Sequence, residues 1–359
     1  MPEDELRRIV DDTRRDSLPY GAGRERVRAR LVSAVQRQAE ARGQTANAAW
    51  IRKVGRAVTP SLDAVWPAVR PEAVLYEVLR DPPDGVLTPA ERRAVAWARP
   101  PRGVRGARWS AADLVLLDEL AALIERPRGY GHVIVDEAQD LSPMECRAVA
   151  RRSEHGSITV LGDLAQGTTP WAATSWPERM ELLGKPDVRL VALTTGFRVP
   201  AAVVELANTL LAALAADVPV TRSYRTDGKV RVTEVAELGA GVAAAVREAL
   251  AFEGSIGVIA ADTDVESLRT ALRSANPAGP GTGADVTAEF GGRLTVLPAS
   301  LAKGLEYDHV IVAEPAAIAA AERRGLNRLY VALTRAVSRL DVVHARPLPP
   351  QLCPPIEPA

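Results

Sequence analysis

The chain has 359 residues, enough for two domains with separate hydrophobic cores, and its 47% hydrophobic and 25% charged residues are typical of a globular protein. Its two cysteines, Cys146 and Cys353, exclude a disulfide framework, and no cysteine–histidine cluster has the spacing of a zinc site. No apolar run reaches the ~18 residues of a membrane span, and acidic residues and arginines follow Met1 in place of a signal peptide. We therefore expect a cytoplasmic protein with no membrane contact.

The 45 basic and 45 acidic residues balance over the whole chain but are unevenly distributed. Residues 1–110 carry 21 basic and 14 acidic residues, so the remainder is net acidic. A basic helical region can meet nucleic acid or an acidic protein surface. An arginine-rich helix face in contact with solvent explains the same pattern.

The first 125 residues are predicted to be helical. Apolar side chains recur at helical spacing in 5–15, 24–41, 47–58 and 88–98. A further helix is predicted over 110–125, where Ser110 can cap the N-terminus and Asp113 stands three residues later.

After residue 130 the pattern changes to alternating strands and helices. Strands are predicted at 132–135, 157–163, 188–193, 229–235, 255–260, 294–297, 309–313 and 339–344. Helices are predicted at 142–152, 200–214, 238–252, 263–274 and 324–338, with a Gly/Pro-rich loop at 276–283. This alternation indicates an α/β fold with parallel sheets, which bind ligands at the C-terminal ends of their strands.

Three acidic residues follow the first of these strands in "VIVDEAQD" (133–140). Asp136 is placed to hold Mg²⁺, a cation that takes oxygen ligands and shares them with phosphates. Glu137 is placed to orient or deprotonate an attacking water. An acidic turn that merely caps the next helix would look similar.

Four further segments narrow the alternatives: "VLGDLAQGTTPW" (160–171), "TTGFR" (194–198), "LAKGLEYDHVIV" (301–312) and "LYVALTRA" (329–336). In order and type, the five segments resemble motifs II to VI of superfamily 1 helicases of the UvrD/Rep group, over roughly residues 130–345. The finer resemblance is to actinobacterial HelD-like factors, which act on RNA polymerase. Motif IV reads "TGFRVP" where the family usually has Asn-Tyr-Arg-Ser, so only the role of Arg198 carries over.

The resemblance implies two RecA-like parallel-sheet domains, the first incomplete, with an N-terminal helical insertion. The expected divisions are a helical region at 1–108, a partial first RecA-like domain at 109–197 and a second RecA-like domain at 198–359. An ATP site would lie between the two RecA-like domains, in a protein expected to be monomeric.

The resemblance also implies roles for the acids and glutamines. Asp136 would bind Mg²⁺, and Glu137 would polarise the water that attacks ATP. Gln139 belongs to the same motif, although a purely structural hydrogen bond would explain it equally well. Gln166 would sense the γ-phosphate, and Asp163 is expected to support its turn rather than to bind metal.

Two arginines would act as arginine fingers on the γ-phosphate, because a guanidinium stays charged and offers a planar fork to phosphate oxygens. These are Arg198 and Arg335, and both are expected to be partly exposed. Glu306 would bond the ribose, and Gly304 would allow close backbone approach. Lys303 would contact phosphate or a neighbouring loop, unless it is an ordinary surface lysine.

Trp171 follows Gln166 by five residues. An aromatic side chain at this place can stack on a nucleic-acid base. Packing at a domain interface is the alternative.

A phosphate-binding loop of the form G-x-x-x-x-G-K-[ST] is missing from the sequence, since neither "LGKP" (183–186) nor "DGKV" (227–230) has Ser or Thr after the lysine. The chain is therefore expected to be the C-terminal part of a larger enzyme. That enzyme would couple ATP hydrolysis to movement on DNA or another nucleic acid, or to remodelling of RNA polymerase. A non-catalytic module that binds polymerase or nucleic acid is the alternative, which the missing loop favours and the retained Glu137 and arginines oppose.

Overall fold

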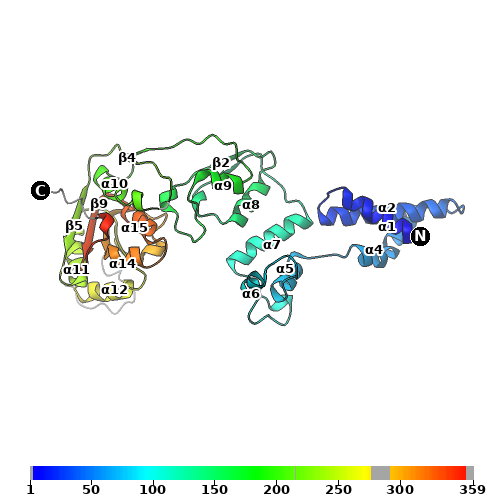
Figure 1. Ribbon diagram of the computed structural model, residues 1–359, viewed down its shortest axis with the longest axis horizontal. Coiled ribbons are helices and arrows are strands. Elements are labelled where there is room, and N and C mark those ends of the chain that lie inside the picture. Colours follow the sequence, from blue (N-terminus) through cyan, green and yellow to red (C-terminus); the bar gives the residue numbers. More distant parts are fainter. Residues whose placement is uncertain (1–2, 215, 276–291, 353–359) are drawn as a thin grey trace. The chain divides into compact units, whose positions relative to one another are not determined.

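The computed structural model describes residues 3–214, 216–275 and 292–352 (Figure 1). The chain divides into two compact units, Met1–Val133 with Met144–Ile158 and Ile134–Pro143 with Thr159–Ala359. The domain limits proposed from the sequence stay predictions, and the loop predicted at 276–283 lies outside the described residues. Among the described helices, none is both long and apolar enough to cross a membrane.

The first unit is helical. Its helices are α1 (Glu3–Arg15), α2 (Tyr20–Glu40), α3 (Ala48–Ala57), α4 (Thr59–Val65), α5 (Pro71–Arg80), α6 (Pro89–Val95), α7 (Ala111–Ile124) and α8 (Pro143–Arg152), with a 3₁₀ turn η1 (Val104–Gly106). The capping residues predicted for α7 are confirmed, because Ser110 Oγ accepts the Asp113 N–H and Asp113 Oδ2 accepts the Ser110 N–H at 2.8 Å. Each N-terminal N–H satisfied in this way removes an orphan donor that would otherwise weaken the helix.

A small core with two aromatic rings holds α2 and α4 together. Val27 and Leu31 of α2 and Leu62 of α4 are buried beside Trp66. The Trp66 ring lies 5.5 Å from the Tyr20 ring, and its Nε1–H donates to the Tyr20 carbonyl at 3.1 Å. Burying each of these aliphatic side chains contributes about 1.5–3 kcal/mol.

The second unit is built on a five-stranded sheet in which every pairing is parallel. Its strands in spatial order are β5 (Lys229–Glu234), β9 (Ala336–His344), β8 (Tyr307–Ala313), β6 (Ile256–Ala260) and β7 (Leu294–Pro298). Two-stranded sheets are formed by β1 (Val133–Val135) with β2 (Ile158–Val160), and by β3 (Thr195–Gly196) with β4 (Arg222–Ser223). The predicted α/β class with parallel sheets is confirmed.

Helices cover both faces of the five-stranded sheet (Figure 1). Along β8, Val310 and Val312 join one hydrophobic cluster while Ile311 and Ala313 join the other, as the two-residue period of a strand requires. The first cluster includes residues of α10 (Ala201–Asn208), α14 (Pro315–Ala320) and α15 (Gly325–Leu333), and the second includes residues of α11 (Leu238–Ala249) and α12 (Val265–Ser274).

The remaining elements of the second unit are short. They are α9 (Trp176–Leu182) and the 3₁₀ turns η2 (Ala138–Asp140), η3 (Leu164–Gln166), η4 (Leu211–Ala213), η5 (Ala299–Leu301) and η6 (Pro350–Leu352). Two of them, η2 and η3, carry the acidic motif and the glutamine motif.

Three predicted elements differ from the structure. Residues 188–193 form no strand, and Leu193 is 79% exposed. Strand pairing begins only at Thr195, the first residue of β3, so the apolar run before it has no partner strand. The helix predicted at 200–214 ends at Asn208. The helix predicted at 324–338 ends at Leu333, because Ala336 already pairs with Tyr307 of β8 and the sheet takes over the chain.

Candidate functional site

The acidic motif lies in a tight turn at the end of β1. Glu137 has a left-handed backbone conformation, with φ of 55°. Its N–H donates to Asp136 Oδ1 at 2.8 Å, and both carboxylates are exposed. A non-glycine residue in this region costs on the order of 1–3 kcal/mol and persists where the surroundings enforce it. The turn is therefore strained at Glu137, and it presents two carboxylates at the surface.

Lys303 joins this turn to the loop before β8. Its Nζ lies 2.9 Å from Glu137 Oε2, forms an ion pair with Asp140, and donates to the Gln166 carbonyl at 3.2 Å. The alternative of an ordinary surface lysine is wrong, because the Lys303 side chain is only 20% exposed. A single ammonium thus links three of the sequence motifs.

Asp140 anchors the acidic turn to the loop that follows η3. Its Oδ1 accepts the N–H groups of Thr168 and Thr169, each at 2.9 Å. Burial alone would raise the pKa of Asp140, but the hydrogen bonds from Lys303 and Thr169 outweigh it and hold that pKa below its usual value. Asp140 is therefore a charged structural residue, a role that its position in the motif did not reveal.

The buried side chains of Gln139 and Arg179 hold the acidic turn in place on the side away from solvent. Gln139 is fully buried, donates from Nε2 to Glu137 Oε2 at 2.6 Å and accepts the Asp163 N–H at 3.0 Å. The buried Arg179 guanidinium of α9 donates to the carbonyls of Gln139, Leu141 and Trp171. The structural explanation of Gln139 is therefore confirmed, whereas Arg179 carried no sequence signal, because these three carbonyls come near it only in the folded chain.

Gln166 lies between Asp163 and Arg335. Its Nε2 donates to Asp163 Oδ2 at 2.8 Å, and its Oε1 accepts from an Arg335 terminal nitrogen at 3.1 Å. Asp163 Oδ1 also accepts the Ala165 N–H at 2.9 Å, which confirms that Asp163 supports the turn. The glutamine motif and the arginine after α15 are thus in direct contact.

The expectation that Arg335 is partly exposed is wrong. The residue is 3% exposed, and its guanidinium donates to the carbonyls of Val331 and Leu305 as well as to Gln166. Burial lowers the pKa of Arg335, and the positive charge of Arg198 lowers it further. Since an arginine titrates far above neutral pH, Arg335 still carries its charge inside the protein.

Arg198 is half-exposed and forms a 2.6 Å ion pair with Glu306, so two predicted site residues from distant segments meet. Gly304 has φ of 78° with no atom close to where a Cβ would be, so the backbone conformation rather than space favours glycine there. Beside Arg198, the exposed rings of Phe197 and Tyr224 lie 5.6 Å apart. The sequence signal that would have found Phe197 is its place next to Arg198 in a chain that is poor in aromatic residues.

Trp171 is 49% exposed, and its Nε1–H donates to the Asp140 carbonyl at 2.8 Å. The hydrogen bond fixes one edge of the indole, and the rest of the ring remains partly open to solvent. Two further residues were missed: Arg324 donates to the carbonyls of Gly167 and Ala172, and the buried Asn327 donates to the Ala165 carbonyl at 2.9 Å. The start of α15 thereby holds the loop that carries Gln166.

The described residues contain no group of three or more metal-ligating side chains that would hold a metal ion by itself. The arrangement instead offers two exposed carboxylates, the partly exposed cations Lys303 and Arg198, and two exposed aromatic rings. Such a set can bind a charged phosphate ligand that brings its own metal, and it can polarise a water molecule.

Comparison with known proteins relates part of this site to a helicase domain. Residues 294–343 match the UvrD-like helicase C-terminal domain, a segment that includes Lys303, Glu306 and Arg335. A search of curated protein sequences finds no significant match.

Similar solved structures are helicases or helicase domains. A complex of arterivirus nonstructural protein 10 (helicase) with DNA shares 18% identity with a TM-score of 0.35, and covers 61% of this chain and 41% of that one. The C-terminal domain of a possible DNA helicase from Lactobacillus plantarum shares 23% identity with a TM-score of 0.32, and covers 44% of this chain and 92% of that one. The PRRSV helicase shares 14% identity with a TM-score of 0.34, and covers 59% of this chain and 34% of that one. The chain thus spans less than half the length of the two viral helicases.

Proposed function

We propose that this chain supplies one side of the ATP site in a UvrD-like motor acting on nucleic acid. The observation that carries the proposal is the meeting of motif residues from distant segments: Lys303 with Glu137, and Arg335 with Gln166. These contacts, with the bond from Lys303 to the Gln166 carbonyl, bring motif residues from four segments of the chain together in one place. The match of residues 294–343 to the UvrD-like helicase C-terminal domain supports the same function.

The exposed acids fit the metal of a Mg–ATP complex. Mg²⁺ usually takes one or two protein carboxylates and completes its shell with water and phosphate oxygens. Asp136 uses Oδ1 to accept the Glu137 N–H, and its Oδ2 has no hydrogen bond among the described residues. Asp136 would therefore hold the ion, which when bound would neutralise charge on the phosphates.

Glu137 is the candidate general base, but its carboxylate is occupied by Lys303. A phosphate oxygen would compete for the Lys303 ammonium, as Glu306 and the phosphate would compete for Arg198. Release of Lys303 would leave Glu137 held at Oε2 by Gln139 alone, with its other oxygen placed to accept a proton from a water molecule. In this account the ion pairs keep the base inactive until a phosphate draws the cations away.

The exposed aromatic rings of Phe197 and Tyr224 offer a surface on which the adenine ring of ATP would stack. Phe197 adjoins Arg198, so a planar ring stacked on Phe197 would lie close to the cation that reaches the phosphates. Phe197→Ala is expected to raise KM for ATP more than it lowers kcat, because stacking contributes to ground-state binding as well as to the transition state.

Nucleic acid is the proposed partner, with Trp171 as a contact. Binding to RNA polymerase is a finer proposal that rests on the HelD-like motif sequences alone. Affinity capture with the motor should recover polymerase subunits if it is right. Unwinding of a tailed duplex without polymerase capture would favour an ordinary UvrD-like motor.

An assay of phosphate release tests the proposal. It uses a polypeptide that joins residues 1–359 to a segment with the missing phosphate-binding loop, the Walker A motif. Glu137→Gln should lower turnover by about 10²–10⁴-fold while ATP still binds. Glu181→Gln, which makes the same change at an exposed position on α9, should have no effect. Equal turnover in the two variants would refute the role of Glu137, and residues 1–359 alone should hydrolyse ATP only at background rate.

A further inference from the structure

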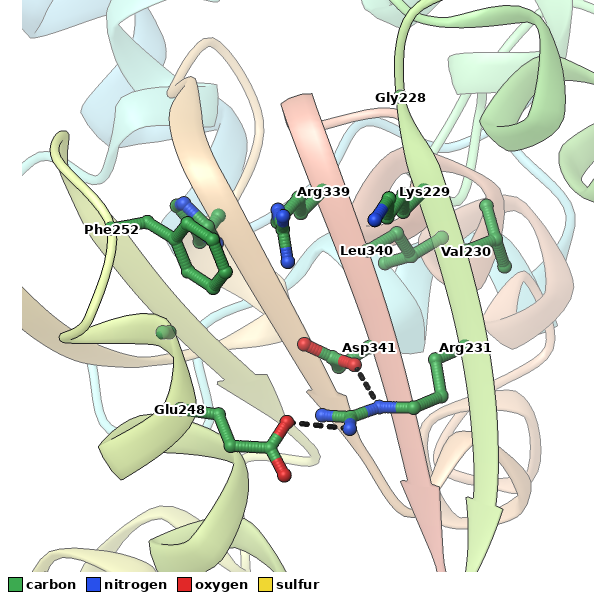
Figure 2. A pocket seen from close by; sticks show the side chains of 11 residues that line it. Gly228, Lys229, Val230, Arg231, Glu248, Phe252, Arg339, Leu340 and Asp341 are labelled. Atoms are coloured by element: carbon green, nitrogen blue, oxygen red, sulfur yellow. Dashed lines mark hydrogen bonds and ion pairs between the residues drawn. The ribbon is translucent and has the colours of Figure 1, made fainter.

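A pocket of about 520 Å³ opens on the sheet where β5, β9 and β8 meet the end of α11 (Figure 2). Its volume lies within the ~300–1,000 Å³ typical of small-ligand sites. It shares no lining residue with the candidate ATP site. The pocket therefore calls for its own explanation.

Two cations stand side by side in this pocket. Lys229 of β5 and Arg339 of β9 are directly paired in register, and His309 of β8 pairs with Arg339 on the other side. Residues at one level of neighbouring parallel strands share a face of the sheet, as Figure 2 shows for Lys229 and Arg339. Like charges placed directly opposite each other destabilise a sheet unless an anion lies between them.

The acidic residues of the pocket do not supply that anion. Asp341 accepts from Arg231 Nε at 2.7 Å, and Glu248 of α11 lies 2.5 Å from an Arg231 terminal nitrogen (Figure 2). Arg231 thus engages both carboxylates. Burial lowers the pKa of His309, and the charge of Arg339 lowers it further, so the imidazole stays neutral near pH 7. Among the described residues, neither Lys229 nor Arg339 forms an ion pair, since both pocket carboxylates pair with Arg231.

Phe252 orients the Arg339 guanidinium. The guanidinium carbon lies 3.5 Å from the centroid of the Phe252 ring, and that ring stacks on His309 at a centroid distance of 5.5 Å. Stacking restrains a flexible side chain while the N–H groups on the edge of its plane remain able to donate. A donor that is already oriented loses less entropy when a ligand binds.

We propose that this pocket binds a phosphate group, held by Arg339 and Lys229. Two adjacent cations match the charge of a phosphate better than that of a single carboxylate, and the fork of Arg339 suits its oxygens. The volume leaves room for the nucleoside attached to that phosphate. The phosphate can belong to a free nucleotide or to a nucleic-acid strand that enters at the edge strand β5.

Calorimetry on residues 1–359 tests this proposal with four probes: inorganic phosphate, AMP, a single-stranded oligonucleotide and polyglutamate. The variant Lys229→Gln/Arg339→Gln removes the two cations. The control Lys185→Gln/Arg247→Gln makes the same charge change outside the pocket, with Arg247 exposed on α11. The pocket variant should bind the phosphate probes about tenfold more weakly than the control, as expected when charged hydrogen bonds are lost.

A loss confined to inorganic phosphate and AMP would identify a free nucleotide as the ligand, and a loss seen with the oligonucleotide would identify a strand. Equal affinities in the pocket variant and the control, or no binding of any phosphate probe, would overturn the proposal. Binding of polyglutamate alone, lost in the pocket variant, would overturn it in favour of an acidic protein partner. The proposal does not depend on the ATP site, because the pocket shares no lining residue with it.

Discussion

The ammonium of Lys303 lies 2.9 Å from the Glu137 carboxylate, and the same ammonium forms an ion pair with Asp140. The Glu137 carboxylate is half-exposed, whereas that of Asp140 is mostly buried, so we assign the two contacts different roles. The pair with Asp140 holds the loops together. The pair with Glu137 is the one that the proposed function requires to open.

Lys303→Met should therefore destabilise the protein. Losing a hydrogen-bonded charge pair of this kind costs about 2 kcal/mol, partly offset because Thr168 and Thr169 still donate to Asp140. Lys185→Met is the matched control and should unfold like the wild type. Chemical denaturation measures both variants, and equal stability would mean that Lys303 does not join the loops.

The acid dependence of this stability follows from the direction of the pKa shift. The pKa of Asp140 is held below its usual value, so its contribution is complete above about pH 4 and is lost as pH falls through the lower folded-state pKa. The difference in unfolding free energy between wild type and Lys303→Met should accordingly shrink below about pH 4. A difference that stays constant down to pH 2 would contradict this account.

Arg335→Ala should behave as a structural lesion. It removes the arginine donor from the Leu305 carbonyl and from Gln166 Oε1, and one of the two side-chain donors from the Val331 carbonyl, which the Thr334 hydroxyl still reaches, at a total cost of about 3 kcal/mol. Arg198→Ala removes a half-exposed side chain and should shift the unfolding free energy by less than about 1 kcal/mol. Thermal unfolding of both variants decides the matter, and equal melting temperatures would show that Arg335 is not structurally required.

Gly162 is expected to tolerate no side chain. A Cβ there would lie 2.4 Å from Gln139 Oε1 and 2.8 Å from the Trp176 ring, so Gln139 would have to release the Asp163 N–H. Gly162→Ala should cost about 1–3 kcal/mol, the usual cost of overpacking. Gly131→Ala, where a Cβ meets nothing within 4 Å, is the control. Equal stability of the two variants would mean that the turn repacks freely.

The sequence predicted the strands of the five-stranded sheet well, because apolar runs bounded by polar turns report local structure. It failed where the outcome depends on tertiary pairing. Residues 336–338 continue a helical pattern but join β9, and the apolar run 188–193 has the composition of a strand without forming one. The contacts of Arg179 and Arg324 were likewise beyond prediction, because they join carbonyls that only the folded chain brings near.

Trp171→Ala should weaken binding of a single-stranded oligonucleotide. Base–aromatic stacking contributes about 1–3 kcal/mol, which corresponds to roughly 5- to 150-fold in affinity. Trp171→Phe keeps an aromatic ring but loses the hydrogen bond to the Asp140 carbonyl, and it should retain most of the affinity. Fluorescence anisotropy with a labelled oligonucleotide measures both. Unchanged binding in the alanine variant would assign Trp171 to packing alone.

The central claim is that the loops joined by Lys303 form one side of an ATP site, and Arg198 tests it most directly because its removal should spare the fold. The measurement is steady-state ATP turnover by a polypeptide that joins residues 1–359 to a Walker A segment, with and without Arg198→Ala. The account predicts a fall in kcat of about 10³-fold, the range found for arginine fingers, with an unchanged melting temperature. Turnover within twofold of wild type would contradict it.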